Sequence, residues 1–189
     1  MGRVNERSMS DEEIARAHVT APTVHNDRIH LADHDPAWPR RFEERAAGIR
    51  GALGEVRLEH VGSTSVPGLP AKPILDLLLI LGDPADEVAY VPGLEALGYV
   101  LTIREPDWYE HRLLKLGGDP PVNLHVLPEG CLEVRRMLAF RDRLRTHKED
   151  RDLYARTKRD LAERTWKYVQ NYADAKTRVV ESILARAGV

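Results

Sequence analysis

The chain has 189 residues, with 28 lysines and arginines against 30 aspartates and glutamates and a formal net charge of −2. That length suits one domain with a sizeable core. The balanced charge excludes a global electrostatic footprint for nucleic acid or a membrane surface, and leaves only a local basic groove open. One cysteine, Cys131, cannot form an internal disulfide, and no stretch approaches the roughly 20 apolar residues of a membrane span. We therefore expect a cytoplasmic protein with neither membrane nor nucleic acid as a partner.

The beginning of the chain predicts an arm followed by a helix. Residues 1–28 are polar and charged, which is typical of a flexible arm, and only the run DEEIARAH has helical character. Trp38 and Phe42 then open an apolar series at helical spacing, behind Asp35 as N-cap and Pro36 as the first helical residue. This series predicts the first helix of the core.

Strand patterns dominate the middle of the chain. EVRLEHV alternates, whereas PILDLLLIL is apolar on both faces, as in a central strand covered on both sides. DPADEVAYVPGLEALG predicts a helix broken at Pro92, and YVLTIRE, HRLLKL and VNLHVL predict three more strands. Beyond Gly130 the apolar spacing becomes helical, and EVRRMLAFRDRLR, EDRDLYARTKRDLAERT and YADAKTRVVESILARA predict three helices. The sequence thus predicts an α+β fold: a core over residues 34–128 and C-terminal helices over residues 131–187, together one domain from 29 to 189.

One acid, Asp76, stands near the start of the most apolar strand. In a strand it shares a face with Leu78 and Ile80. A carboxylate buried there without a partner would be costly, so it needs donors, a cation or an edge position. Asp76 could serve a ligand, or it could cap or salt-bridge within the fold.

The loop before this strand, HVGSTSVPGLPAK, predicts a site for an anion. Gly62 would let a phosphate approach the backbone closely, and Lys72 could neutralise that phosphate or pair with Asp76. Three consecutive hydroxyl groups could bind the anionic oxygens, those of Ser63, Thr64 and Ser65. A structural turn stiffened by proline and glycine is the alternative.

The block HVGSTSVPGLPAKPILD, with DPAWPRRFEE upstream and NLHV, LAFRDRLR, YARTKRDLA and YADAKTRVV downstream, resembles the GrpB-like family of the nucleotidyltransferase (polymerase-beta-like) superfamily. The resemblance covers about residues 29 to 187. It implies a mixed sheet flanked by helices. It also implies that Gly62 and Ser63 hold the phosphates of a nucleotide, and that Asp76 is the first of the catalytic acids that bind two magnesium ions.

The other acids of that superfamily have no counterpart here. The second would fall at Leu78, and VNLHVL offers Asn123 and His125 on one face but no acid. Shared carboxylates are what make two-metal catalysis work. Histidine could replace part of the ligation, because imidazole with a carboxylate suits zinc, manganese or iron better than magnesium. A site for one divalent metal (magnesium, manganese or zinc) formed by His60, Asp76 and His125 is the hypothesis, and hydrogen-bonded core histidines are the alternative.

Further basic residues are candidates for phosphate contacts. Arg141 in FRD and Lys158 in RTKRD lie on predicted helices, where most charges are solvated. Arg112 follows Trp108 and Tyr109 in REPDWYEHR. These aromatic residues could stack on a base or ring, or could simply pack the turn.

Three functions fit these residues. The first is a metal-dependent nucleotidyltransferase that binds a nucleotide or another phosphorylated small molecule and moves a nucleoside monophosphate. The second is a binding or accessory module without catalysis; relatives of the family fused to dephospho-CoA kinase imply a place near coenzyme A synthesis and that kinase as a partner. The third is a phosphoryl enzyme with one metal held by histidine and aspartate.

Overall fold

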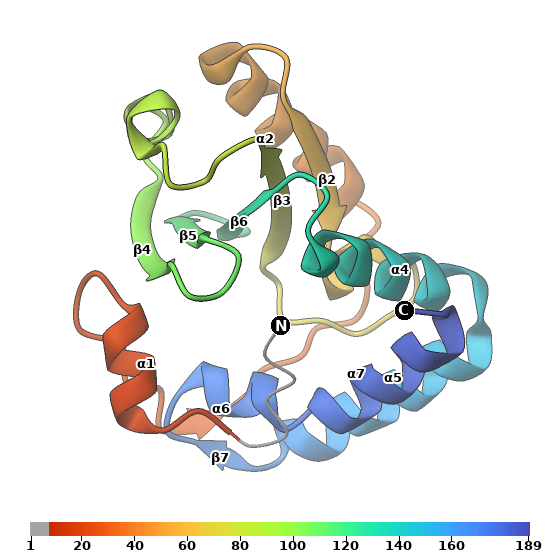
Figure 1. Ribbon diagram of the computed structural model, residues 1–189. Coiled ribbons are helices and arrows are strands. Elements are labelled where there is room, and N and C mark those ends of the chain that lie inside the picture. The colour runs from red at the N-terminus through yellow and green to blue at the C-terminus, as the bar shows by residue number, and fades with distance from the viewer. Residues whose placement is uncertain (1–7) are drawn as a thin grey trace.

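The computed structural model describes residues 8–189, so residues 1–7 of the predicted arm lie outside the described residues. Figure 1 shows a central sheet with helices packed around it. The elements, in chain order, are α1 (Asp11–Ala17), β1 (Asp27–Arg28), α2 (Trp38–Leu53), β2 (Arg57–Val61), the 3₁₀ turn η1 (Ser63–Ser65), β3 (Leu75–Leu81), η2 (Glu87–Ala89), α3 (Val91–Ala96), β4 (Val100–Glu105), β5 (His111–Leu116), β6 (Val122–Pro128), α4 (Leu132–Thr146), α5 (Lys148–Ala162), β7 (Thr165–Trp166), α6 (Val169–Asp174) and α7 (Thr177–Ala187).

The main sheet has five strands in the order β2-β3-β6-β5-β4. Strands β3 and β6 run parallel, and the other neighbours run antiparallel. The crossover between β3 and β6 carries α3 and the hairpin of β4 and β5. The sheet is therefore mixed, and the predicted α+β class with a mixed sheet flanked by helices is confirmed.

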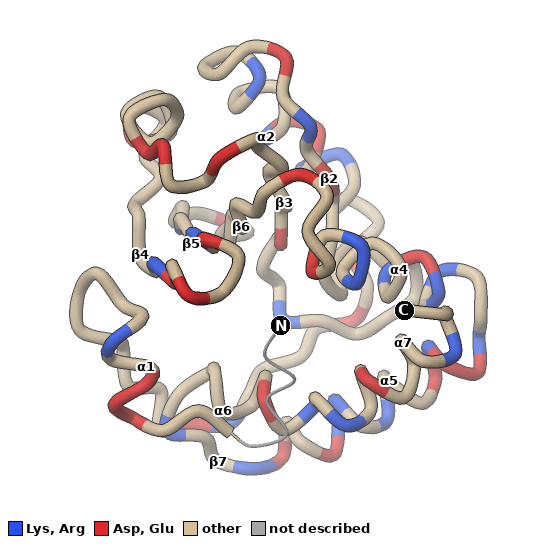
Figure 2. Tube along the Cα trace, viewed as in Figure 1, with Lys and Arg blue, Asp and Glu red and all other residues tan. Residues whose placement is uncertain are grey.

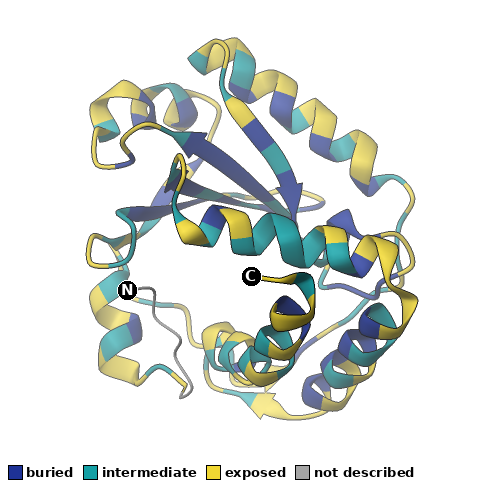
Figure 3. Ribbon diagram, turned by 45° about the vertical axis from the view of Figure 1, so that its right-hand side comes forward, coloured by how far each residue is buried: buried dark blue, intermediate teal, exposed yellow. Residues whose placement is uncertain are grey.

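The two faces of β3 are buried against different helices. Leu75, Leu77 and Leu79 pack in a core cluster with Trp38 of α2 and Leu94 of α3. On the opposite face, Leu78 and Ile80 pack with Val134 of α4. Figure 3 shows the strands as largely buried between these layers. The apolar run in the sequence is thus a central strand covered on both sides, as predicted.

Helices α5, α6 and α7 form a C-terminal layer across from the sheet, on the side where α4 packs (Figure 1). Leu144, Tyr154 and Ile183, from α4, α5 and α7, share a cluster with Val66 and Leu69 of the loop before β3. Positively and negatively charged residues are interspersed along these helices (Figure 2). None of the helices within residues 8–189 is long and apolar enough to cross a lipid bilayer.

Two helix boundaries differ from the sequence prediction. Helix α2 begins at Trp38 instead of Pro36, because the Asp35 carboxylate accepts the Ala37 amide (2.8 Å) and so holds the turn before the helix. The last predicted helix is interrupted after Asp174, which separates α6 from α7. The interruption places Lys176 at the N-cap of α7.

The described part of the predicted arm packs on the domain. The Ile14 side chain of α1 is buried, and His18 forms a β-bridge with Ile103 of β4. Strand β1 pairs with β7 in a small second sheet. The division into an arm and one domain remains a prediction.

Leu78→Ala should lower the free energy of unfolding by about 2–5 kcal/mol, because the substitution leaves a cavity between β3 and α4. Leu78 is 0% exposed, whereas Val100 in β4 is 62% exposed. Val100→Ala is therefore the control and should change stability by less than about 0.5 kcal/mol. Urea unfolding followed by circular dichroism measures both. Equal losses in the two variants would contradict the packing of α4 on β3.

Candidate functional site

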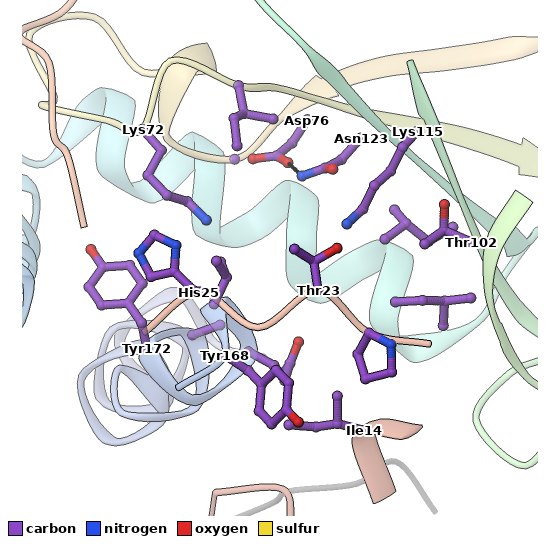
Figure 4. Close-up of a pocket in the computed structure, with 18 of the residues that line it drawn as sticks. Ile14, Thr23, His25, Lys72, Asp76, Thr102, Lys115, Asn123, Tyr168 and Tyr172 are labelled. Atoms are coloured by element: carbon purple, nitrogen blue, oxygen red, sulfur yellow. Dashed lines mark hydrogen bonds between the residues drawn. The ribbon is translucent and has the colours of Figure 1, made fainter. Parts of the chain in front are cut away.

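The carboxylate of Asp76 faces a cavity of about 590 Å³ between the sheet and the C-terminal layer. Strand β3 provides Asp76, and its parallel neighbour β6 provides Asn123 at the paired position. The Asn123 Nδ2 atom donates to Asp76 Oδ1 over 2.9 Å. Figure 4 shows this pair on the sheet side of the cavity, with Tyr168 and Tyr172 on the opposite wall. The predicted face of β3 is therefore the face that lines the cavity.

Gly62 is required by Asp76. A Cβ atom at position 62 would lie 2.3 Å from Asp76 Oδ2 and 2.8 Å from Asp76 Cβ. The backbone of Gly62 also has φ +66°, a conformation that L residues rarely adopt. The glycine that the sequence assigned to the approach of a phosphate thus makes room for the carboxylate itself.

Lysines from several elements converge on the same cavity. Lys72 precedes β3, Lys115 is on β5, Lys158 is on α5 and Lys176 lies between α6 and α7. In Figure 4, Lys72 and Lys115 point into the cavity from either side of the pair that Asp76 forms with Asn123. These four are the lysines that line the cavity, and Asp76 is its one carboxylate among the described residues. The cavity therefore holds four basic side chains against one acidic side chain.

The protein environment penalises these charges. Burial raises the pKa of the Asp76 carboxyl, although Asn123 and the lysines act in the opposite direction. Burial lowers the pKa of Lys158 to about 7, against the attraction of Asp76. Burial, followed by repulsion from Lys72 and Lys158, lowers the pKa of Lys176 to about 6. A single carboxylate thus does not compensate the buried lysines.

Of the three predicted hydroxyl groups, that of Ser63 contacts a cavity lysine. Lys158 Nζ donates to Ser63 Oγ over 2.7 Å and also to the Pro70 carbonyl. The Thr64 hydroxyl bonds to His60 Nε2 (3.1 Å). Ser65 Oγ donates to the Gly62 carbonyl (2.6 Å) and closes the turn. The structure therefore brings Gly62, Ser63, Lys72 and Lys158 to the cavity of Asp76. Thr64 also lines this cavity, with its hydroxyl bonded to His60, whereas the Ser65 hydroxyl is used within the loop.

The structure does not bring His60, Asp76 and His125 together. Val61 is the residue of β2 that pairs with Asp76, so the side chain of His60 points to the opposite face of the sheet. There it stacks on Phe42 at a ring separation of 4.8 Å. His125 lies on the same face of the sheet as Asp76, two residues beyond Asn123 on β6.

The two predicted arginines are held in ion pairs elsewhere. Arg112 donates to Glu87 over 2.6 Å, on the α2 and α3 side of the sheet. Arg141 donates to Glu59 (2.9 Å) and to Asp142 (2.7 Å), in a groove beside His60. Arg112 points to the face of the sheet opposite Asp76, and the side of α4 that carries Arg141 faces away from Asp76. Neither guanidinium group therefore reaches the carboxylate.

The donors around Asp76 do not fit a magnesium centre. Asp76 Oδ1 accepts from Asn123, Leu78 occupies the position of the second acid beneath α4, and lysines surround the carboxylate. Within residues 8–189, no group of three His, Cys, Asp or Glu side chains could hold a metal ion. Two-metal chemistry requires shared carboxylates, which this arrangement does not offer.

Three residues of the site were not predicted from the sequence. Lys115 shares one face of β5 with Leu113, so its face could be predicted, but not its distance from Asp76. Lys176 gave no signal, because a break between α6 and α7 positions it. Tyr172 is 2% exposed and lines the cavity, and its hydroxyl has no hydrogen-bond partner within residues 8–189.

The model of the family described as GrpB protein matches residues 28–186 of the chain. A UPF0157 protein of Halalkalibacterium halodurans is 52% identical over 185 residues, which are 97% of this chain and 94% of the relative. A crystal structure of the conserved protein GrpB from Enterococcus faecalis is 29% identical with a TM-score of 0.72, and the match covers 84% of this chain and 96% of that chain.

Two more distant similarities concern larger proteins. The dephospho-CoA kinase of Mycolicibacterium paratuberculosis is 26% identical in an alignment of 198 positions, gaps included, that covers 89% of this chain and 46% of the kinase. The poly(U) polymerase Cid1, in a structure bound to MgATP, is 11% identical with a TM-score of 0.45, and the match covers 68% of this chain and 45% of that chain.

Gly62→Ala should destabilise the protein more than Gly54→Ala does. Both glycines have a positive φ, but nothing lies within 4 Å of a Cβ atom at position 54. Gly54→Ala should therefore cost only the backbone strain of about 1–3 kcal/mol for a side chain in this nearly glycine-only conformation (φ +80°, ψ −154°). Gly62→Ala should add the collision with Asp76, and an Asp76→Gly background should relieve that addition. Chemical unfolding of the four variants measures this coupling, and equal costs at both glycines would contradict it.

Proposed function

From the lysine-lined cavity, and from the GrpB protein family to which the chain belongs, we propose that the protein binds a phosphorylated small molecule. A nucleotide is the first candidate. The phosphate groups lie beside Ser63 and between Lys72, Lys158 and Lys176. The observation that carries the proposal is the excess of partly or fully buried lysines around one acid. Buried cations without matching anions are costly, and a phosphate supplies both the charge and the acceptor oxygens.

The size and the walls of the cavity support a small organic ligand. Its volume of about 590 Å³ lies in the range of small-molecule sites. The unpartnered hydroxyl of Tyr172 is a buried polar group available to a ligand. Ile14, Val24 and the ring of Tyr168 add apolar surface on the side away from the sheet. This combination suits a ligand with phosphates at one end and a less polar body at the other.

A metal centre formed by the protein is not part of the proposal, because the donors do not fit one. Lysine ammonium groups can neutralise phosphate charge instead. Any magnesium would enter with the nucleotide as part of the ligand.

An accessory role is the second candidate. The observation in its favour is that mycobacterial relatives named dephospho-CoA kinase match this chain over less than half of their own length. Such a module would bind a phosphorylated intermediate of coenzyme A synthesis in the same cavity without transforming it. Titration of dephospho-CoA beside nucleoside triphosphates separates the two candidates by relative affinity.

Lys176→Gln should weaken binding of pyrophosphate and of nucleoside triphosphates by about tenfold or more, since one charge-assisted contact of about 1.5–3 kcal/mol is lost. The free variant should be as stable as the unmodified protein or more stable, because a penalised buried charge is removed. Lys148→Gln is the control, since Lys148 lies on α5 with its side chain 76% exposed. Isothermal titration calorimetry with and without Mg²⁺ measures the affinities. Equal affinities for both variants, or no binding to the unmodified protein, would contradict the proposal.

The stability of the ligand-free protein should depend on pH through Lys176. Below its folded-state pKa of about 6, folded and unfolded chains both carry the proton and the penalty of burial is complete. Between that value and the ordinary 10.5, the unfolded chain keeps a proton that the folded chain has released, so the free energy of unfolding rises with pH. Lys176→Gln should therefore exceed the unmodified protein in stability at about pH 6, and the difference should narrow towards about pH 9. Urea unfolding across this range tests the sign, and a widening gap would contradict it.

A further inference from the structure

A second cavity, of about 390 Å³, adjoins the phosphate cavity. The two share residues of α1, the hairpin of β4 and β5, β6 and α6, and His125 belongs to both. The second cavity has mainly apolar walls, including Trp108, Leu127 and Met137. A molecule in this cavity would meet the ligand of the first one at His125.

His125 ends a chain of hydrogen bonds that begins at a carboxylate. Glu105 Oε2 lies 2.9 Å from His111 Nδ1, and His111 Nε2 lies 3.1 Å from His125 Nδ1. The His111 side chain is buried, and the ring of Trp108 packs on it edge to face at 5.1 Å. The geometry of the chain is thus fixed by packing as well as by hydrogen bonds.

The carboxylate determines the direction of the chain. A carboxylate oxygen only accepts hydrogen bonds, so His111 donates from Nδ1 and, when neutral, accepts at Nε2. His125 must then donate from Nδ1, which leaves the lone pair on its Nε2 atom. Burial, with His111 and Lys115 adding to it, lowers the pKa of His125 to about 3 and keeps the ring neutral. His125 therefore offers a free acceptor nitrogen at the junction of the cavities.

This nitrogen lies close to the proposed phosphate position. His125 follows Asn123 on the same face of β6, and Asn123 is bonded to Asp76. Two residues along a strand span about 6.6 Å. A hydroxyl group bonded to His125 Nε2 can therefore reach a phosphorus atom held beside Asp76 and the lysines.

We propose that Glu105, His111 and His125 form a proton relay, and that His125 Nε2 accepts the proton of a hydroxyl-bearing second ligand bound in the adjoining cavity. The proposal rests on the nucleotide binding proposed above. The hydroxyl oxygen forms a bond to the α-phosphorus of a nucleoside triphosphate, and the bond from that phosphorus to the bridging oxygen breaks. Pyrophosphate leaves with the electron pair. The products are the nucleoside monophosphate ester of the alcohol, pyrophosphate and one proton on the relay.

The relay compensates for the weak basicity of a buried imidazole. When Nε2 of His125 takes up the proton, its Nδ1 proton can pass to His111 Nε2 along the 3.1 Å hydrogen bond. The positive charge then rests on His111, next to the Glu105 carboxylate. Glu105 and His111 are positioning residues in this scheme, and His125 is the catalytic base.

The direction of the relay can be measured without a substrate. Two-bond proton–nitrogen correlation spectra of protein labelled with ¹⁵N-histidine should show His125 with a protonated Nδ1 and an unprotonated Nε2 at about neutral pH. Glu105→Gln should introduce the Nε2-protonated form of His125, because a glutamine amide can donate to His111 and reverse the chain. Glu129→Gln, at an exposed acid just beyond β6, is the matched control and should leave the spectrum unchanged. A protonated Nε2 in the unmodified protein, or no change in Glu105→Gln, overturns the relay.

The catalytic role is tested with ATP and with glycerol as the hydroxyl donor, by following pyrophosphate release. His125→Asn keeps a side-chain donor towards His111 but lacks the nitrogen that faces the cavities. It should slow release by at least about 100-fold, while calorimetry shows the Kd for ATP within about twofold of that of the unmodified protein. If ATP binds but the unmodified protein releases no pyrophosphate, or if the variant releases it equally fast, the relay is wrong and nucleotide binding stands. If ATP does not bind at all, the proposed function fails and the relay with it.

Discussion

The partly buried carboxylate of Asp76 constrains residues from several parts of the chain. It excludes a side chain at Gly62, occupies the amide of Asn123 on the neighbouring strand, and attracts lysines from the loop before β3, from α5 and from the start of α7. These residues are distant in the sequence, so their convergence depends on how the C-terminal layer packs against the sheet. A charged group that would be costly alone thus helps to specify how two layers of the fold are joined.

The fold was largely predictable because its signals are local. The apolar run of β3 predicted a central strand, and two-sided burial by α2 and α4 confirms it. The interruption between α6 and α7 was missed, since the sequence there contains no proline or glycine and the periodicity alone favours one helix. The N-cap at Asp35 was wrong for a related reason. Its carboxylate satisfies an amide of the preceding turn, and residue type alone does not distinguish these two roles.

The site was predictable only where one strand or loop carries it. Alternation along β3 gave the face of Asp76, and adjacency gave Gly62, Ser63 and Lys72. The inclusion of His60 failed to account for pairing register, because Val61 is the partner of Asp76 and the histidine on the neighbouring position turns away. Arg141 and Lys158 looked alike as basic residues on charged helices, yet Arg141 pairs with Glu59 while Lys158 reaches Ser63. The rotation of each helix relative to the sheet determines which side chain faces the cavity. This rotation cannot be inferred from the pattern of one sequence.

The electrostatics of the cavity favour an anionic ligand. In the proposed complex, the bound anion raises the pKa values that burial lowers for Lys158 and Lys176, so ligand charge and protein charge increase together. A second carboxylate at position 78 would have neutralised part of that positive charge, but Leu78 is enclosed by α4 and belongs to the core. Leu78 pairs with His125 of β6. His125 is therefore the ionisable residue that follows Asn123 on this face of the strand. In the proposed reaction, lysines thus provide charge compensation and the histidine relay provides a proton acceptor, two tasks that shared carboxylates and metal ions would otherwise divide between them.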